Sequence, residues 1–243
     1  MHFLQNLINI LLPPRCLKCG KILSIRNGLC AECFAKIRFI SAPMCSCCGR
    51  PFTSAGHLKF ARKQMCGACL KKKTHLFTMQ RSAFIYDDES KNMILNLKFC
   101  DKTTYAETLA NFLYSAGMDI WKQNPDFLIP VPIHHIRLLK RRYNQCALLA
   151  KYLSDKVSVP TDYRSLIRVR NTIPQIELSG KARRTNLRHA FEVKFPQNIK
   201  GKKIVLIDDV STTGSTLNEC AKALKKAGAS KIYALTLART DNL

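Results

Sequence analysis

The segment Ile204–Thr216 constrains the fold of this chain more than any other, because it joins a buried strand to a helix through a short polar loop. Ile204–Ile207 is apolar and β-branched, which is typical of a strand buried on both faces. Asp208 and Asp209 follow, and we expect them to end the strand. Apolar spacing from Ser215 to about Ala227 then predicts a helix. This succession favours phosphate binding, since the first N–H groups of a helix are unpaired and its dipole attracts an anion.

Two carboxylates beside a phosphate would repel it unless they face another part of the ligand. The conflict is resolved if Asp208 and Asp209 face the hydroxyls of a sugar, or a Mg²⁺ that bridges sugar and phosphate. The segment therefore predicts a ribose 5-phosphate ligand, with the two aspartates on its diol and as the candidate catalytic pair. The candidate phosphate-binding residues are Ser211, Thr212, Thr213, Gly214, Ser215 and Thr216. The alternative is a polar turn in which one aspartate caps the helix and the hydroxyls are solvated.

Paired cysteines mark residues 1–75, where Cys-x-x-Cys-Gly followed by Cys-x-x-Cys occurs twice. Two thiolates at i and i+3 on a tight turn can share one zinc, and two such turns complete a tetrahedral site. We expect a double zinc ribbon with structural Zn²⁺, two ions if both sites fill. The expected ligands are Cys16, Cys19, Cys30, Cys33, Cys45, Cys48, Cys66 and Cys69. Cys47 is then left over, and His57 and His75 could replace a thiolate. Redox pairs are the alternative, but redox chemistry favours one isolated pair near a βαβ unit.

The chain is strongly basic, with a formal net charge of +24 from 40 Lys and Arg against 16 Asp and Glu. A basic excess favours a polyanionic partner, and nucleic acid is the first candidate. A generally basic proteome is the alternative. No apolar run approaches the roughly 20 residues that span a bilayer. Phe3–Leu12 is apolar but lacks the basic start of a signal peptide, so we expect an N-terminal helix, no membrane span and a cytoplasmic location.

The rest of the chain alternates predicted strands and helices, as an α/β domain does. We expect strands over Arg81–Tyr86, Asp126–Pro132, Ser165–Val169 and Lys231–Ala238, and helices over Ser90–Lys98 and Thr104–Ala116. Two prolines end the second of these strands, because proline cannot continue a β-ladder. Cations follow this rigid loop, as a pyrophosphate site requires. The candidate residues are Val131, Pro132, His134 and Arg137. For His134 the alternative is a loop histidine without a ligand.

A basic wall extends from Arg137 to Arg188, with 13 Lys and Arg against three acidic residues. Its part Leu178–Arg188 contains a glycine and suits a lid that closes over an anion. The wall could bind a sugar pyrophosphate, a nucleic-acid backbone, or both. The candidate nucleic-acid contacts are Lys140, Arg141, Arg142, Arg183, Arg184 and Arg188.

Val205–Thr216 resembles the phosphoribosyl-pyrophosphate (PRPP) motif of type I phosphoribosyltransferases. The chain resembles more narrowly the ComF family, competence-associated proteins with a zinc ribbon ahead of a phosphoribosyltransferase-like domain. That match rests on the Val-Pro-x-His-x-x-Arg pattern of Val131–Arg137, on Arg141 with Tyr143–Gln145, and on Thr172–Phe191. Arg142 departs from the family pattern, which has glycine there. In the family the position of Lys98 commonly lies near the pyrophosphate; a surface lysine at a helix end is the alternative.

The resemblance implies a helix and double zinc ribbon over residues 1–75. Over residues 81–243 it implies an α/β domain like that of type I phosphoribosyltransferases, with a mostly parallel sheet and a hood. It also implies a competence protein of natural transformation that binds PRPP with Mg²⁺, and single-stranded DNA during DNA uptake. A competence helicase is a further candidate partner. The alternative function is an active phosphoribosyltransferase, which transfers ribose 5-phosphate from PRPP to an acceptor that the sequence does not identify.

Overall fold

The computed structural model describes residues 13–24, 28–52, 64–99, 105–170, 187 and 189–241, except the side chains of Lys98, Phe99, Arg137 and Lys140. The strands are β1 (Met79–Ile85), β2 (Phe127–Pro130), β3 (Leu166–Arg168), β4 (Phe191–Val193), β5 (Lys203–Ser211) and β6 (Lys231–Arg239). The helices are α2 (Ala31–Lys36), α3 (Gly67–Leu70), α4 (Asp88–Phe99), α5 (Tyr105–Ala116), α6 (Met118–Trp121), α7 (His135–Arg141), α8 (Gln145–Val157), α10 (Pro196–Ile199) and α11 (Ser215–Lys226).

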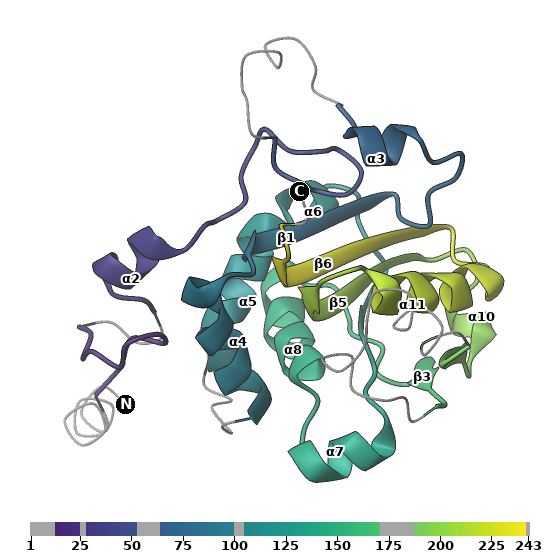
Figure 1. The fold of residues 1–243 in the computed structure, drawn as a ribbon. Coiled ribbons are helices and arrows are strands. Elements are labelled where there is room, and N and C mark those ends of the chain that lie inside the picture. The colour runs from purple at the N-terminus through teal and green to yellow at the C-terminus, as the bar shows by residue number, and fades with distance from the viewer. Residues whose placement is uncertain are drawn as a thin grey trace.

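Four strands form one sheet in the order β1-β6-β5-β2, and every neighbouring pair in it is parallel (Figure 1). β5 and β6 lie at its centre, and their register runs from Lys203 opposite Lys231 to Ser211 opposite Arg239. β3 and β4 form a separate antiparallel pair. The expected α/β fold with a mostly parallel sheet is thus confirmed. The carboxyl ends of the four parallel strands meet at one edge, which is where open α/β sheets bind ligands.

Each face of the sheet has its own hydrophobic core. Val205 and Ile207 belong to the core that α5 and α8 cover, whereas Ile204 and Leu206 belong to the core beneath α11. Figure 1 shows these helices on opposite sides of the sheet. All four side chains are fully buried. Burial on both faces explains why this strand is continuously apolar rather than alternating.

The central strand β5 does not end at the two aspartates. It continues through Asp208 and Asp209 to Ser211, because β6 offers pairing partners as far as Arg239. The prediction that the carboxylates end the strand is therefore wrong. The helix α11 begins at Ser215, as predicted, and it is followed by Gly228 with φ 88°, a left-handed conformation that suits glycine after a helix.

The other predicted elements lie within a few residues of their expected bounds, but several short ones were not predicted. These are α2, α3, α6, α7, α10 and β4, each of three to seven residues. Elements of this length contain too few residues to show a helical or strand period. The expected N-terminal helix over Phe3–Leu12 and the segment Thr172–Leu178 lie outside the described residues. Among the described helices, none has the length and apolar character needed to cross a bilayer.

The cysteine-rich segment runs along the outer edge of β1. Ile85 donates its N–H to the carbonyl of Arg38 (2.9 Å), and Ile40 donates to the carbonyl of Ala83 (2.9 Å). Near the other end of the strand, Gln80 donates to the carbonyl of Cys47 (2.7 Å). In Figure 1 this segment and α3 lie beside β1, on the side away from β6. The edge of the sheet is therefore partly paired by residues that precede the α/β domain in the sequence.

Candidate ligand site and zinc centres

The loop after β5 lies at the carboxyl edge of the sheet and leads directly into α11. Gly214 occupies the N-cap position with φ 71° and ψ 8°, which glycine adopts without strain. Glycine brings no side-chain oxygen to the first turn of the helix, where anions bind. Thr213 Oγ1 and Ser215 Oγ lie 2.7 Å apart within the same turn. The segment thus forms a glycine turn before a three-turn helix, and phosphate binding at this turn stays a prediction.

Asp208 and Asp209 are nearly buried, at 8% and 5% exposure, and specific donors hold their carboxylates. Oδ1 of Asp208 accepts the N–H of Asp209 (2.9 Å) and the thiol of Cys146 (3.4 Å). Oδ1 of Asp209 accepts the N–H of Val210 (2.7 Å), while its Oδ2 accepts the side-chain amide of Gln145 (2.9 Å). Buried carboxylates require such donors. The protein itself thus fixes the orientation of both acids.

The segment Tyr143–Gln145 ties neighbouring elements to this acid pair. The hydroxyl of Tyr143 donates to the carbonyl of Leu97 in α4 (2.6 Å). Asn144 caps α8 by accepting the N–H of Cys146 (2.9 Å), and its Nδ2 donates to the carbonyl of Val131 (3.1 Å). These residues belong to the family-like pattern of the sequence, which by itself predicts no individual role for them. The signal was available in part, because an Asn before an apolar helical pattern is a typical N-cap.

The loop after β2 reaches the same edge of the sheet. Val131 donates its N–H to the carbonyl of Ile207 (2.9 Å), which places the loop beside the acid pair. His134 is 5% exposed and is the N-cap of α7, where a ring nitrogen accepts the N–H of Ile136 (3.4 Å). His134 therefore has a structural role in the loop, and its contact with a ligand stays a prediction, as does that of Pro132.

Arg142 ends α7 in the left-handed conformation, with φ 64° and ψ −19°. This conformation strains a residue that carries a Cβ atom, whereas glycine adopts it freely. The backbone at Arg142 is thus one that would favour glycine at this position. In this chain arginine occupies that left-handed position.

Several predicted contacts cannot be placed. The side chains of Lys98, Arg137 and Lys140 lie outside the described residues, as do Arg183, Arg184 and Arg188. Of the candidate nucleic-acid contacts, Arg141 and Arg142 are described; Arg142 is exposed and Arg141 is partly buried.

The cysteines gather into two groups of four, as their spacing predicts. The first group is Cys16, Cys19, Cys30 and Cys33, and the second is Cys45, Cys48, Cys66 and Cys69, with the sulfur atoms of each group within 4.8 Å of one another. Zn–S bonds of about 2.3 Å place the sulfurs of a tetrahedral site about 3.8 Å apart. The Sγ atoms of Cys19 and Cys30 lie 3.8 Å apart, and those of Cys48 and Cys66 lie 3.7 Å apart. Both donor sets therefore fit structural zinc.

Backbone N–H groups favour the thiolate form of the first cysteine in each group. Burial by itself raises the pKa of the Cys16 thiol, but N–H groups of neighbouring residues bring that pKa down to about 6. For Cys45, burial likewise raises the pKa, but backbone N–H groups bring it down to about 7. By contrast, burial and neighbouring sulfurs raise the pKa of Cys33 to about 12. Thiolates are the metal-binding form of cysteine, so metal binding must release protons from such sites.

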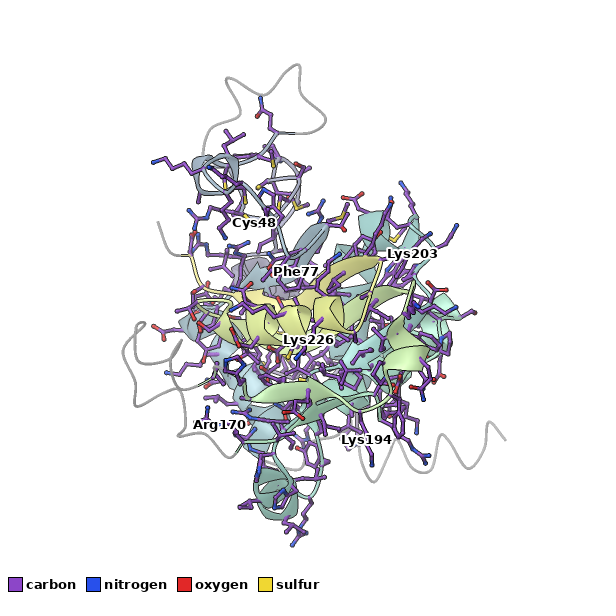
Figure 2. All side chains as sticks on the ribbon, turned by 90° about the vertical axis from the view of Figure 1, so that its right-hand side faces the viewer. Cys48, Phe77, Arg170, Lys194, Lys203 and Lys226 are labelled. Atoms are coloured by element: carbon purple, nitrogen blue, oxygen red, sulfur yellow. The ribbon has the colours of Figure 1, made fainter. Side chains whose placement is uncertain are left out.

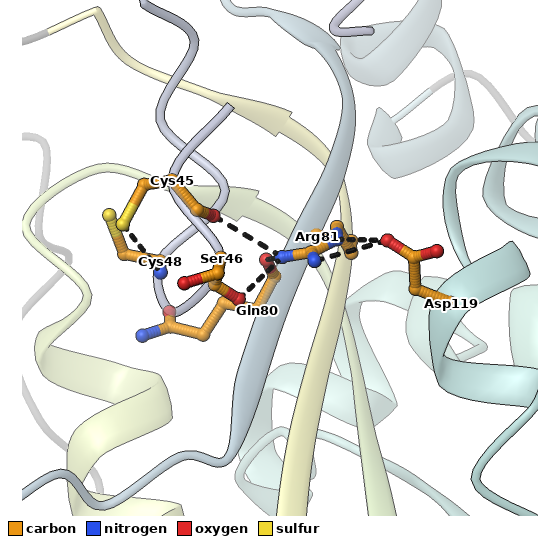
Figure 3. A network of polar contacts seen from close by, with 6 residues as sticks. All are labelled: Cys45, Ser46, Cys48, Gln80, Arg81 and Asp119. Carbon is orange, nitrogen blue, oxygen red and sulfur yellow. Dashed lines mark hydrogen bonds and ion pairs between the residues drawn. The ribbon is translucent and has the colours of Figure 1, made fainter. Parts of the chain in front are cut away.

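The second cysteine group is fastened to the α/β domain through Arg81 (Figure 3). Arg81 belongs to β1 and is 5% exposed. Its Nη1 donates to the carbonyl oxygens of Ser46 (3.2 Å) and Cys45 (3.5 Å), and its Nη2 lies 3.2 Å from Oδ2 of Asp119. One buried guanidinium thus connects the backbone of the metal-binding turn to α6.

The same cysteine group also reaches the phosphate loop. Arg239, the last residue of β6, donates from Nη1 to the carbonyl of Cys48. The next residue, Thr240, donates its N–H to the carbonyl of Ser211 (3.1 Å) and its hydroxyl to the carbonyl of Thr212 (3.2 Å). A cavity of about 20 Å³, room for about one water, lies at this junction. It is lined by Cys48, Gln80, Arg81, Ser82, Ser211, Leu217, Ala234, Thr236 and Arg239.

Comparison with known proteins agrees with this arrangement. A family model described as "Double zinc ribbon domain" matches residues 7–70, and one described as "Phosphoribosyl transferase domain" matches residues 144–242. The chain is 36% identical to Competence protein F of Haemophilus influenzae over 231 residues, which cover 93% of this chain and 96% of that protein. It is 33% identical to the DNA utilization protein YhgH of Escherichia coli O157:H7 over 235 residues, which cover 94% and 98% of the two chains.

Among solved structures, a purine phosphoribosyltransferase from Pyrococcus horikoshii Ot3 aligns with 56% of this chain and 78% of its own, at 21% identity and a TM-score of 0.36. The assignment of the chain rests on the curated relatives and on the two family models. The two modules that the family models describe are present in the expected order. The chain belongs to the ComF family of competence proteins, with a double zinc ribbon ahead of a phosphoribosyltransferase domain.

Proposed function

We propose that this ComF protein binds PRPP together with Mg²⁺ at the carboxyl edge of its sheet. One observation carries the proposal: the buried pair Asp208 and Asp209 lies on the strand that leads into the glycine-capped N-terminus of α11. The helix terminus offers a site for a phosphate, and the carboxylates offer acceptors for two hydroxyls. These are the two recognition features of a ribose 5-phosphate.

In this proposal the 5-phosphate lies on Ser211–Thr216, the diol lies on Asp208 and Asp209, and the pyrophosphate lies near Val131. Mg²⁺ would be held by the two carboxylates and by oxygens of PRPP, and it would neutralise part of the negative charge of the pyrophosphate. Gln145 donates to one oxygen of Asp209, and Cys146 donates to one oxygen of Asp208. They therefore turn the acids into a fixed orientation before a ligand arrives, which reduces the entropy lost on binding.

Calorimetric titration of Mg²⁺–PRPP into the protein tests this proposal. We expect the double variant Asp208→Asn, Asp209→Asn to bind about 100- to 10,000-fold more weakly, because hydrogen bonds to charged groups contribute about 1.5–3 kcal/mol each. Asp155→Asn is the matched control, since it makes the same chemical change at an exposed position of α8. Equal affinity in the wild type and the double variant would overturn the proposal.

We also propose that the protein acts in the cytoplasm on incoming single-stranded DNA during natural transformation. The net charge of +24 supports this, because phosphate contacts by Lys and Arg supply most of the affinity for a DNA backbone. In Figure 2, Arg170, Lys194 and Lys226 lie on the side of the molecule that carries α11 and the β3–β4 pair. These side chains could contact a DNA backbone bound on this side of the molecule.

The salt dependence of DNA binding tests this second part. We expect fluorescence anisotropy with a labelled oligothymidylate to show affinity that falls steeply with salt, by about 0.7 in the log–log slope for each phosphate contacted. The variant Arg141→Ala, Arg142→Ala should reduce that slope, whereas the exposed control Lys91→Ala on α4 should not. Affinity that is independent of salt would contradict the proposal.

Catalytic turnover is the second candidate function, and the match to a phosphoribosyl transferase domain over residues 144–242 favours it. Displacement at the anomeric carbon passes through a cationic transition state, which two nearby carboxylates would stabilise. Phosphorus NMR of PRPP, mixed with each nucleobase and with ammonia, measures whether pyrophosphate is released. Absence of release with every acceptor would leave PRPP binding, and not transfer, as the activity of this domain.

A further inference from the structure

The second zinc centre has more ligands than one tetrahedral ion can use. Besides its four cysteines, Cys47 lies in the same turn and His75 follows α3. The ligand atoms of Cys47, Cys69 and His75 all lie within 4.8 Å of one another. The Sγ of Cys47 is 3.4 Å from Nδ1 of His75. Cys69 thus belongs to two groups of potential ligands at once.

The geometry of the extra group fits a metal ion. Bonds of about 2.3 Å to sulfur and 2.0–2.1 Å to nitrogen leave about 3.5 Å between two ligands of a tetrahedral zinc. The 3.4 Å between Cys47 and His75 agrees with this separation. Cys47 is 8% exposed and Cys69 is 5% exposed, so the sulfurs are shielded, whereas the ring of His75 is exposed. An ion entering from the side of His75 would keep one open position toward solvent.

The first zinc centre lacks these additions. The internal repeat aligns Cys16-Leu-Lys-Cys19 with Cys45-Ser-Cys47-Cys48, so Lys18 occupies the position of Cys47. Lys18 forms an ion pair with Glu89 of α4 instead. Within the described residues, the first four cysteines share no member with an additional group of potential metal ligands. The extra ligands are therefore a property of the second repeat and not of the ribbon fold.

We propose that the second ribbon binds two thiophilic divalent ions, Zn²⁺ or Cd²⁺, with the thiolate of Cys69 as a bridge between them. The first ion takes the four cysteines of the group, and the second takes Cys47, Cys69, His75 and one solvent ligand. Two divalent ions balance four of the five thiolate charges. The exposed run Lys71–Lys73 lies next to Cys69 in the sequence and offsets the remaining negative charge.

Native mass spectrometry of the full chain, with Zn²⁺ added in small excess, counts the ions. We expect three ions in the wild type, two in Cys47→Ser and two in His75→Gln. Cys220→Ser is the matched control, because it removes a buried thiol far from both centres in the sequence and should retain three. The third ion should also be the first that a weak chelator removes, since it has three protein ligands rather than four.

Two results would overturn the proposal. One is a wild type that never exceeds two ions; the other is a third ion that persists in both variants, which would mean adventitious binding. Cys47→Ser could lose more than one ion because the turn fails to form. His75→Gln then tests the proposal, since His75 is exposed and its replacement should leave the turn folded. Cadmium NMR gives an independent measurement: the wild type should show three ¹¹³Cd resonances, and His75→Gln should lose one of them.

Discussion

Gln145 donates a hydrogen bond from Nε2 to Oδ2 of Asp209 over 2.9 Å, and so joins the first residue of α8 to the central strand. Gln145 is 5% exposed, and its Oε1 has no hydrogen-bond partner among the described residues. Such an unpaired buried acceptor costs free energy, which is characteristic of a group that awaits a donor. Gln145 is thus a positioning residue for the acid pair, beside the proposed diol site.

We expect Gln145→Leu to weaken binding of Mg²⁺–PRPP about 5- to 20-fold, because Asp209 loses the donor that orients it. Calorimetric titration measures the change. Gln197→Leu on α10 is the control, since Gln197 is exposed and remote from the acid pair in the sequence. Unchanged affinity in Gln145→Leu would show that the orientation of Asp209 does not depend on this contact.

Arg81 and its partner Asp119 should respond very differently to substitution. Arg81→Met removes a buried donor from the carbonyls of Ser46, Gln80 and Cys45, the last of which keeps the N–H of Gly49. We expect a loss of about 2–3 kcal/mol in the free energy of unfolding. Asp119 is 53% exposed, and Asp119→Asn should cost less than about 1 kcal/mol. Urea denaturation of the zinc-loaded protein compares them. Equal effects would mean that the ion pair, and not the carbonyl contacts, stabilises this junction.

Arg142→Gly should stabilise the protein. Arginine at φ 64° is strained by about 1 kcal/mol, although glycine increases the entropy of the unfolded chain and offsets part of the gain. We therefore expect a net increase of about 0.5 kcal/mol in the free energy of unfolding, which urea denaturation can resolve. Arg142→Ala retains the Cβ atom and should bring no such increase.

Acid should destabilise the protein partly through Asp126. Its Oδ2 accepts the N–H of Lys203 (2.8 Å) and its Oδ1 lies 3.4 Å from Nζ of Lys202, and these contacts hold the pKa of its carboxyl below its ordinary value. A lowered pKa contributes stability above the unfolded value, and this is lost as the pH falls through the folded pKa. We expect Asp126→Asn to flatten the decline of the melting temperature below about pH 4. An unchanged pH profile would contradict this assignment.

Loss of metal from the second zinc centre should loosen the start of β1. The N–H of Gln80 donates to the carbonyl of Cys47, which lies inside the metal-binding turn. We expect Cys66→Ser to accelerate hydrogen exchange of the Gln80 amide by about 10-fold or more, because that bond opens with the turn. Cys30→Ser, which affects the first centre, is the matched control. Equal acceleration in both variants would mean that the whole segment unfolds as one unit.

The sequence predicted those features whose causes are local. An apolar run between polar loops identified β5, and apolar spacing from Ser215 identified α11. Cysteine spacing identified both zinc centres, because two i, i+3 pairs have few other uses in one chain. In each case the residues that carry the signal are also the residues that form the element.

Features that depend on partners distant in the sequence could not be predicted. The continuation of β5 to Ser211 depends on β6, which contributes the pairing residues up to Arg239. The contact of Gln145 with Asp209 spans 64 positions, and that of Arg239 with Cys48 spans 191. No local pattern distinguishes such side chains from solvated ones. The boundary between residues 1–75 and 81–243, and the ligand contacts themselves, stay predictions.

Main-chain hydrogen bonds from residues 38–47 cover the outer edge of β1, and the fold of this segment depends on zinc. A shortened chain without these residues would present a bare row of main-chain donors and acceptors, onto which a second molecule could add its own strand. The zinc-ribbon segment therefore also prevents edge-to-edge pairing of β1 between two molecules. Loss of zinc should therefore expose this edge of the sheet and favour aggregation.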